Sequence, residues 1–461
     1  MERLLPEKLL ESLTPLAGYD EEAFVRAHEP GEPVTSIRIN PAKCEIGELF
    51  AGLGARQQVP WCPLGYYLPQ RPSFTFDPLF HAGCYYVQEA SSMFLDQVLR
   101  QEINPHKPLR VLDLCAAPGG KSTHILSRLP TGSLLVSNEV IRSRVPILRE
   151  NLVRWGRPQV VVTSNDPRDF AGLEGYFDLM LVDAPCSGSG LFRKDPDARE
   201  AWSESLVTLC AQRQQRILAD AWPCLKQGGL LVYATCSYSE QEDEAILRWI
   251  RGQFAGESVD LLTDPSWGIA LSAEPGATGY RFWPHRLRGE GLFLTAFRKS
   301  EGKDSFRSPV RNQVKPISSG QRAQLDPWVQ PSGWTYFQQP DGLFAIPQDL
   351  VADLPVLLAS LRVLQPGIQV GNLLHDKFVP DHALALSPLV PEGLGIWNLS
   401  REDAVRYLQK KEWTGPLPPR GLHRVAYRDH PLGWINSLGS RVNNYYPKSL
   451  RIRKERSEEP V

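Results

Sequence analysis

The stretch RVLDLCAAPGGKS, residues 110–122, decides the fold class. Its apolar start predicts a short strand over residues 111–114, and a helical pattern resumes at Lys121 after a turn that carries Gly119 and Gly120. Glycines let the backbone approach a ligand closely, and the free amides at the start of a helix point at that ligand. The order of strand, glycine turn and helix therefore predicts the nucleotide-binding end of an α/β sheet.

The same stretch limits the kind of nucleotide. A phosphate loop needs the pattern GxxxxGK[ST], but Cys115 stands where its first glycine belongs, and the dinucleotide pattern GxGxxG is also absent. The next predicted strand ends at Glu139, about twenty residues past the glycines, where an acidic side chain can hold both ribose hydroxyls. These features predict S-adenosylmethionine. An ordinary strand-to-helix turn followed by an incidental glutamate is the alternative, because one glycine pattern is a weak signal.

Strands and helices alternate between residues 108 and 298, which predicts a Rossmann-like, doubly wound parallel sheet. The predicted strands cover residues 111–114, 134–138, 160–163, 177–182 and 229–234, with later strands near 259–262 and 291–298. The predicted helices cover residues 121–127, 141–155, 203–222 and 241–253, the last opened by a capping box of Ser239 and Glu242. Ligands bind at the carboxyl ends of such strands, and four polar residues fall there: Glu139, Asp166, Asp183 and Cys236.

The chain of 461 residues is long enough for several domains. We predict an N-terminal α+β RNA-binding domain (residues 1–100), an S-adenosylmethionine-dependent methyltransferase domain (101–300), a polar linker (301–334) and a mainly β C-terminal region (335–461). In the first domain, Arg38 and Lys43 could face phosphates, although solvated charges are the more common case. The tail SRVNNYYPKSLRIRK combines tyrosines with cations, which fits either a base-stacking RNA surface or an amphipathic edge strand.

Charge and cysteine content exclude little. Fifty-one Lys and Arg against 52 Asp and Glu give a formal net charge of -1, so RNA would have to be held by local clusters of cations. The eight cysteines show no zinc-type spacing, and we expect free thiols and no metal. No apolar run is long enough to span a bilayer, so we expect a soluble, cytoplasmic monomer without membrane contact.

Two cysteines follow strand ends in the predicted sheet: Cys186 in VDAPCSGSG and Cys236 in YATCSYSE. For either cysteine alone a structural role is the default, since cysteine is often buried. Two thiols in neighbouring loops beside a cofactor turn instead suit methylation of a carbon atom. Pyrimidine C5 becomes nucleophilic only after something adds to C6, and a thiolate can do so. Asp183 is placed to act as an acid at N3.

The order of these motifs resembles the NOP2/Sun family of RNA cytosine-C5 methyltransferases, and most closely its bacterial small-subunit ribosomal RNA branch, the RsmF type. The resemblance rests on SIRINPAK, GCYYVQEASS, DLCAAPGGKS, the strand ending at Glu139, VDAPCSGSG with RKDP, YATCS and PHRLRGEGLF. The C-terminal tail is similar to a PUA-like module. The resemblance implies 5-methylcytosine formation in 16S ribosomal RNA, free or within the small subunit, with S-adenosylmethionine as the cofactor.

The family's residue roles carry over by motif. Cys236, in the Thr-Cys pair, would be the nucleophile, Cys186 would assist product release, and Asp183 would reach both the base and the cofactor. Arg193 and Lys194 of RKDP would lie near the substrate. The remaining cofactor contacts implied by the resemblance are Cys115, Ala116, Ala117, Pro118, Gly119, Gly120, Lys121, Glu139 and Asp166.

Two other functions remain open at this point. The same chemistry could act on transfer RNA, and nothing in the local chemistry excludes DNA. Alternatively, the chain could be a noncatalytic ribosome-assembly factor that binds RNA and keeps the cofactor fold as a scaffold. Two thiols at one rim argue against a scaffold, because a scaffold needs neither.

Overall fold

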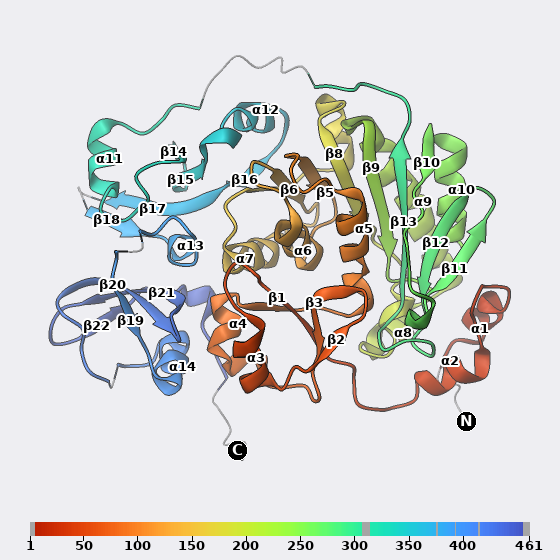
Figure 1. Ribbon diagram of the computed structural model, residues 1–461, viewed down its shortest axis with the longest axis horizontal. Helices are drawn as coiled ribbons and strands as arrows, with labels where there is room; N and C mark the ends of the chain where they lie inside the picture. The colour runs from red at the N-terminus through yellow and green to blue at the C-terminus, as the bar shows by residue number, and fades with distance from the viewer. Residues whose placement is uncertain (1–4, 307–313, 375–376, 392, 414, 455–461) are drawn as a thin grey trace.

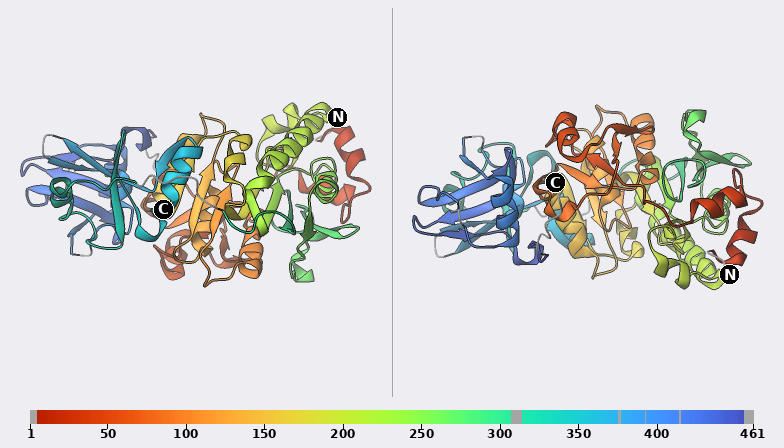
Figure 2. Two further views of the ribbon diagram at one scale, coloured as in Figure 1. Left: turned by 90° about the horizontal axis from the view of Figure 1, so that it is seen from above. Right: turned by 90° about the horizontal axis from the view of Figure 1, so that it is seen from below.

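The computed structural model describes residues 5–306, 314–374, 377–391, 393–413 and 415–454 (Figure 1). A large central sheet is accompanied by three four-stranded sheets, one in the N-terminal part of the chain and two in the C-terminal part. Viewed from above and below, the C-terminal strands and the helices α1 and α2 (Glu7–Leu13, Glu21–Ala27) lie at opposite ends of the molecule (Figure 2).

The central sheet has the strand order β11-β12-β13-β9-β8-β5-β6-β7-β16, and β10 pairs with β13. The neighbours from β9 to β7 run parallel, whereas the outer strands are antiparallel. This arrangement confirms the predicted Rossmann-like sheet. Its strands are β5 (Arg110–Asp113), β6 (Leu134–Asn138), β7 (Val160–Thr163), β8 (Phe177–Asp183), β9 (Leu225–Thr235), β10 (Gly256–Ser258), β11 (Ala270–Glu274), β12 (Ala277–Phe282), β13 (Leu292–Lys299) and β16 (Val363–Pro366).

Successive residues of a strand point to opposite sides of the sheet. Here both sets are apolar, so helices cover both faces. Val111 belongs to the core with α5 (Leu95–Glu102), α6 (Gly120–Arg128) and α7 (Val145–Trp155). Its neighbour Leu112 belongs to the opposite core with α9 (Glu204–Ala221), α10 (Glu244–Gln253) and α12 (Asp353–Ser360). Shorter helical segments join these elements: α8 (Pro196–Ala201), η2 (Ser91–Phe94), η3 (Pro167–Leu173), η4 (Ser189–Leu191), η5 (Trp222–Cys224) and η6 (Pro265–Trp267).

Two local predictions in this domain are wrong. Residues 259–262 form no strand, because β10 ends at Ser258. Beyond it, one backbone hydrogen bond, from Val259 to Ala296, continues the pairing with β13. The capping box is absent as well, because α10 begins at Glu244 and the carboxylate of Glu242 turns inward to bond elsewhere.

The N-terminal sheet has the order β2-β3-β1-β4. The sequence analysis expected Arg38 and Lys43 to face either phosphates or solvent, and both expectations are wrong. Arg38 is fully buried and bonds Gln88, Thr123 and the carbonyl of Gly120, while Lys43 donates to two backbone carbonyls. Arg38 thus joins this sheet to the glycine turn. The elements are β1 (Ser36–Ile39), β2 (Gln57–Val59), β3 (Cys62–Tyr67), β4 (Tyr85–Val87), α3 (Ile46–Leu53), α4 (Pro78–Ala82) and η1 (Phe74–Phe76).

The C-terminal region forms two sheets, β14-β15-β17-β18 and β19-β20-β21-β22. The predicted domain boundaries stay a prediction. The central sheet extends beyond the predicted boundary at residue 300, because β16 from the C-terminal region pairs with β7. The predicted linker contains the helix α11. The elements are α11 (Ser319–Leu325), β14 (Trp334–Gln339), β15 (Gly342–Pro347), η7 (Gln348–Leu350), β17 (Ile368–Leu374), β18 (Lys377–Pro380), α13 (His382–Ala385), β19 (Ile396–Asn398), α14 (Arg401–Gln409), β20 (Gly421–Tyr427), β21 (His430–Ser437), β22 (Val442–Asn444) and η8 (Lys448–Leu450).

Three observations bear on the other expectations from the sequence. In the basic tail, Tyr446 is buried against Tyr407 and His382, so it offers no face for a base, whereas Tyr445 is exposed. Within the described ranges no helix combines the length and apolar character that crossing a membrane requires. All eight cysteines are free thiols.

Candidate active site

The glycine turn between β5 and α6 forms the first wall of the site. Gly119 has a φ of 109°, a left-handed conformation that favours glycine, and a Cβ there would lie 3.2 Å from Leu148. Ser122 fixes the start of α6 by donating to Asp113 over 2.6 Å. Burial raises the pKa of Asp113 to about 7. The other turn residues pack closely, with Ala116 and Ala117 buried, Cys115 partly buried and Pro118 exposed.

Glu139 lies directly after β6 and is 2% exposed. Its Oε1 accepts from the backbone of Ile141 over 2.8 Å. Its Oε2 accepts no hydrogen bond among the described residues, and the nearest cation is Arg144, whose Nη1 lies 3.4 Å away. A buried carboxylate oxygen without a donor suits the hydroxyl donors of a ribose, so the residues present fit the predicted cofactor.

Asp166, another residue predicted to contact the cofactor, caps η3 through the backbone of Arg168 and pairs with Arg216 at 3.1 Å. Burial opposes ionisation of Asp166, but the bonds from Arg216 and Arg168 outweigh it and lower the pKa of its carboxyl group. A carboxylate at this rim can accept from the exocyclic amino group of an adenine.

Lys121 and Asp183 meet from different elements, α6 and the end of β8. Their Nζ and Oδ2 atoms are 2.7 Å apart. Burial disfavours the ammonium ion, but the charge of Asp183 and its hydrogen bond outweigh it and raise the pKa of Lys121. The Cys236 side chain contributes to raising the pKa of Lys121 as well.

The two thiols predicted from the sequence lie together. Cys186 Sγ is 3.1 Å from Cys236 Sγ, and both residues are partly accessible. The hydrogen bond to Cys236, together with burial, raises the pKa of Cys186 well above its ordinary value. Cys186 therefore keeps its proton and can donate it in a hydrogen bond to the Cys236 sulfur.

A buried carboxylate that the sequence reasoning missed connects the two thiol loops. Glu242 Oε2 accepts from the hydroxyls of Ser187, over 2.5 Å, and Ser237, over 2.6 Å, and its Oε1 accepts from the backbone of Ser187 over 2.7 Å. Burial raises the pKa of Glu242, and these bonds oppose that shift. The available signal was the acidic run of residues 242–244 between β9, which ends at Thr235, and α10; all three residues are buried.

Arg193 and Lys194 lie beside a second missed carboxylate, Glu290 of the PHRLRGEGLF segment. Arg193 donates to the carbonyl of Gly289, and the two cations lie 3.5 and 3.7 Å from the Glu290 oxygens. Glu290 is 2% exposed, and burial raises its pKa. The next residue packs on the thiol loops, since a Cβ on Gly291 would lie 2.8 Å from Gly190.

Four family models match the chain. They describe the N-terminal domain of 16S rRNA methyltransferase RsmF (residues 5–90), 16S rRNA methyltransferase RsmB/F (100–298), the first C-terminal domain of RsmF rRNA methyltransferase (325–387) and the RsmF PUA domain (396–452). Similar curated proteins include the ribosomal RNA small subunit methyltransferases F of Shigella boydii and Pectobacterium atrosepticum. Each is 29% identical, with 90% of this chain and 90% or 89% of the relative covered.

Solved structures agree with the fold. A methyltransferase homolog protein from Pyrococcus horikoshii superposes with a TM-score of 0.55 at 29% identity, covering 64% of this chain and 96% of that one. NSun6 from the same organism, in complex with the S-adenosylmethionine analogue SFG, has a TM-score of 0.55 at 21% identity over 65% of this chain and all of its own. On this fold and these four matched regions, the chain belongs to the RsmB/F family of S-adenosylmethionine-dependent methyltransferases.

Proposed function

We propose that this enzyme methylates C5 of a cytosine in 16S ribosomal RNA through a covalent bond between Cys236 and C6 of the base. The observation that carries the proposal is the contact between Cys186 and Cys236, 3.1 Å apart, beside the pair of Lys121 and Asp183. Methyl transfer to nitrogen needs no thiol, since a ring or amino nitrogen has its own lone pair. A scaffold needs neither thiol.

Each residue has a defined task in this chemistry. The Cys236 thiolate, favoured by the donated bond from Cys186 and by the charge of Lys121, adds to C6 and pushes electrons toward N3 and C5. Asp183 faces N3, and the Lys121 proton reaches N3 through the Asp183 carboxyl group, which leaves a neutral enamine that is nucleophilic at C5. S-adenosylmethionine, when bound, supplies an electrophilic methyl group. Cys186 assists removal of the C5 proton, directly after giving up its own proton or by positioning the acceptor. Cys236 then leaves C6 as a thiolate, and the N3 proton returns to the pair of Asp183 and Lys121.

The RNA must bring an accessible cytosine to these thiols, so the base is flipped out or already unpaired. A cleft of about 430 Å³ between α7, β16 and the C-terminal segment supports an RNA path toward the site. Arg142, Arg149 and Arg362 line it, and α7 begins six residues after Glu139. Family membership supports 16S ribosomal RNA over transfer RNA as the substrate.

The covalent step is tested by replacing each thiol. With substrate RNA and S-adenosylmethionine, Cys236→Ala should be inactive and free of attached RNA, because the bond to C6 never forms. Cys186→Ala should still add and methylate but release slowly, so it should give a slowly migrating, nuclease-sensitive band on a denaturing gel. That band should disappear in the double variant. A band from Cys236→Ala would exchange the two roles, and full activity of both single variants would refute the mechanism.

The substrate is tested by bisulfite sequencing of ribosomal and transfer RNA from cells with and without the gene. We expect one or more 16S cytosines to lose protection. Loss confined to transfer RNA would reject the ribosomal assignment and leave the thiol chemistry intact.

A further inference from the structure

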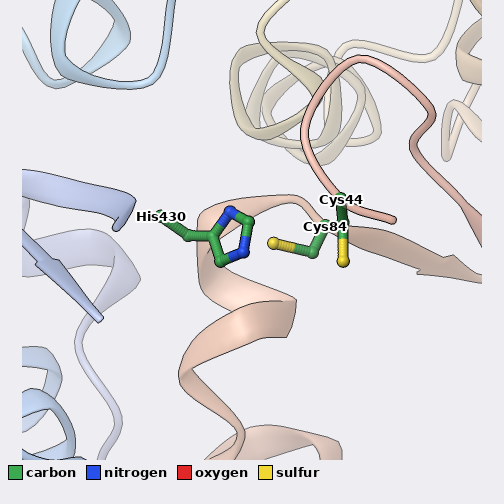
Figure 3. Close-up of side chains that lie close together, drawn as sticks. All are labelled: Cys44, Cys84 and His430. Carbon is green, nitrogen blue, oxygen red and sulfur yellow. The ribbon is translucent and has the colours of Figure 1, made fainter. Parts of the chain in front are cut away.

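Three side chains that are distant in sequence meet where the N-terminal sheet contacts the last C-terminal sheet. Cys44 follows β1, Cys84 precedes β4, and His430 opens β21. One ligand atom of each lies within 4.8 Å of the others (Figure 3). In the close-up the Cys84 sulfur points toward the His430 ring, with Cys44 beside it. Cys84 is fully buried and Cys44 is 7% exposed.

A fourth donor comes from α3. Glu48 Oε2 is 2.7 Å from His430 Nε2 and 3.5 Å from Cys44 Sγ, and its side chain is 46% exposed. Glu48 therefore joins the cluster through His430 and Cys44, whereas the mutual 4.8 Å spacing holds for the two thiols and the imidazole. Ligand atoms around a tetrahedral zinc ion lie about 3.3 to 3.8 Å apart, given Zn–S and Zn–N bonds of about 2.3 and 2.0 Å. The clustered donors, which lie within 4.8 Å of one another, must move closer together to reach that geometry.

The backbone directs His430 into this position. Arg428 and Asp429 occupy the turn between the paired residues Tyr427 and His430, and both have positive φ values, 49° and 63°. Non-glycine residues rarely adopt this conformation, and each costs on the order of 1 kcal/mol. Asn398 braces the turn by bonding Asp429 through both its side-chain atoms. The turn therefore holds the imidazole at the boundary between the two sheets.

A second cluster of similar composition already contains a cation. Cys62, Asp96 and His124 also lie within 4.8 Å of one another. There, however, both Asp96 oxygens accept from Arg128, over 2.8 and 2.9 Å, and one also contacts His124. A guanidinium ion already supplies the positive charge. In the first cluster, Glu48 contacts the His430 imidazole and the Cys44 thiol. The charges of Lys43 and Arg428 act on Cys84 and Glu48, and neither cation forms an ion pair there among the described residues.

We propose that Cys44, Cys84, His430 and Glu48 bind one Zn²⁺ ion that fastens the PUA-like sheet to the N-terminal domain. Two thiolates and a carboxylate carry three negative charges that a divalent ion largely offsets, and thiolates favour zinc over magnesium or calcium. Four protein ligands make the site structural rather than catalytic. The donors stand at positions 44, 48, 84 and 430, so no local spacing could signal them.

The test measures metal content in the full-length, tag-free protein. Wild type should carry about one zinc per chain by plasma mass spectrometry, and Cys44→Ser, Cys84→Ser and the double variant should carry less than one tenth of that. Cys62→Ser, from the second cluster, should keep its zinc. So should Cys186→Ser with Cys236→Ser, which excludes binding at the catalytic thiols.

Cobalt gives a second readout that does not depend on how the variants fold. Wild type stripped of metal should develop thiolate-to-Co²⁺ absorption and visible bands of a tetrahedral site, and His430→Ala should change those bands. The proposal would be overturned if the wild-type protein contained no zinc and developed no cobalt absorption. It would also be overturned if zinc were lost only when Cys186 and Cys236 are replaced. A Cys44–Cys84 disulfide in protein purified under reducing conditions would also overturn it, in favour of a redox pair.

Discussion

Glu242 accepts two hydrogen bonds from Ser187, one from its backbone N–H and one from its hydroxyl group. Ser187 follows Cys186, and the same carboxylate accepts from Ser237, which follows Cys236. The contact between the two thiols therefore depends on a third loop. We regard Glu242 as a positioning residue, since it contacts the thiol loops and not the thiols themselves.

Replacing this carboxylate should slow catalysis without unfolding the protein. In Glu242→Gln one acceptor oxygen becomes a donor: at Oε2 the change removes the acceptor of both serine hydroxyls, and at Oε1 it removes the acceptor of the Ser187 backbone. We expect kcat to fall on the order of tenfold to hundredfold, because small misplacements of reacting groups are costly. Cofactor affinity should not change. The measurement is single-turnover methylation together with the rate of adduct formation in a Cys186→Ala background.

Glu240→Gln is the matched control, because Glu240 lies in the same segment but pairs with Arg248 near the surface. Equal rates for both variants would show that the loops hold their positions without Glu242.

Glu139→Ala should weaken S-adenosylmethionine binding by roughly 1.5 to 3 kcal/mol, the value of a hydrogen bond to a charged group. Calorimetric titration measures the dissociation constant, and Glu257→Ala, an exposed glutamate on β10, serves as the control. An unchanged constant in the folded Glu139 variant would mean that its unpartnered oxygen does not face the cofactor.

Asp113 should make stability depend on pH. Burial raises its pKa in the folded state from 3.8 to about 7, so the folded state holds a proton that the unfolded state releases. The stabilisation is therefore complete below about pH 4 and is lost as the pH rises to about 7. Asn keeps an acceptor for Ser122 but cannot ionise. Between pH 5 and 8, wild type should lose about 3 kcal/mol more than Asp113→Asn in denaturant unfolding.

Asp341→Asn, at an exposed position, should keep the pH dependence of wild type. Parallel pH profiles for wild type and Asp113→Asn would show that Asp113 is ionised throughout this range.

Arg38→Ala should destabilise the protein by about 3 kcal/mol, because it leaves several buried acceptors without a hydrogen-bond donor. The guanidinium group bonds Gln88, Thr123 and Gly120 and lies over the Trp155 ring at 4.6 Å. Arg38→Lys should recover only part of the loss, because an ammonium group lacks the planar fork. Thermal unfolding with Arg56→Ala, an exposed arginine, as the control checks this. A loss equal to that of the control would refute the structural role.

The cleft beside α7 should contribute to RNA affinity through its exposed cations. Arg142→Gln combined with Arg362→Gln should weaken RNA binding and reduce the slope of log K against log salt by about 1.4, if each contacts a phosphate of single-stranded RNA. Lys107→Gln with Arg251→Gln removes the same charge from other exposed positions. Equal slopes for the two pairs would mean that the cleft does not follow the RNA backbone.

The sequence by itself determined the parts of this protein that depend on local pattern. Apolar runs and glycines placed the strands of the sheet, with β6 and β7 at their observed limits, and parallel strands then bring their carboxyl ends to one rim. That is why Glu139, Asp183, Cys186 and Cys236 could be named as neighbours from their positions after strands.

Tertiary structure alone decided which polar groups are buried and what they contact. Arg38 and Glu242 look like surface charges in the sequence, but packing between distant segments places both in the interior, where each must find partners. The same holds for Cys44, Cys84 and His430, whose spacing carries no signal because three separate elements bring them together. Hydrophobic periodicity indicates which face of a single helix or strand is exposed. Contacts between residues hundreds of positions apart form only when the elements pack together.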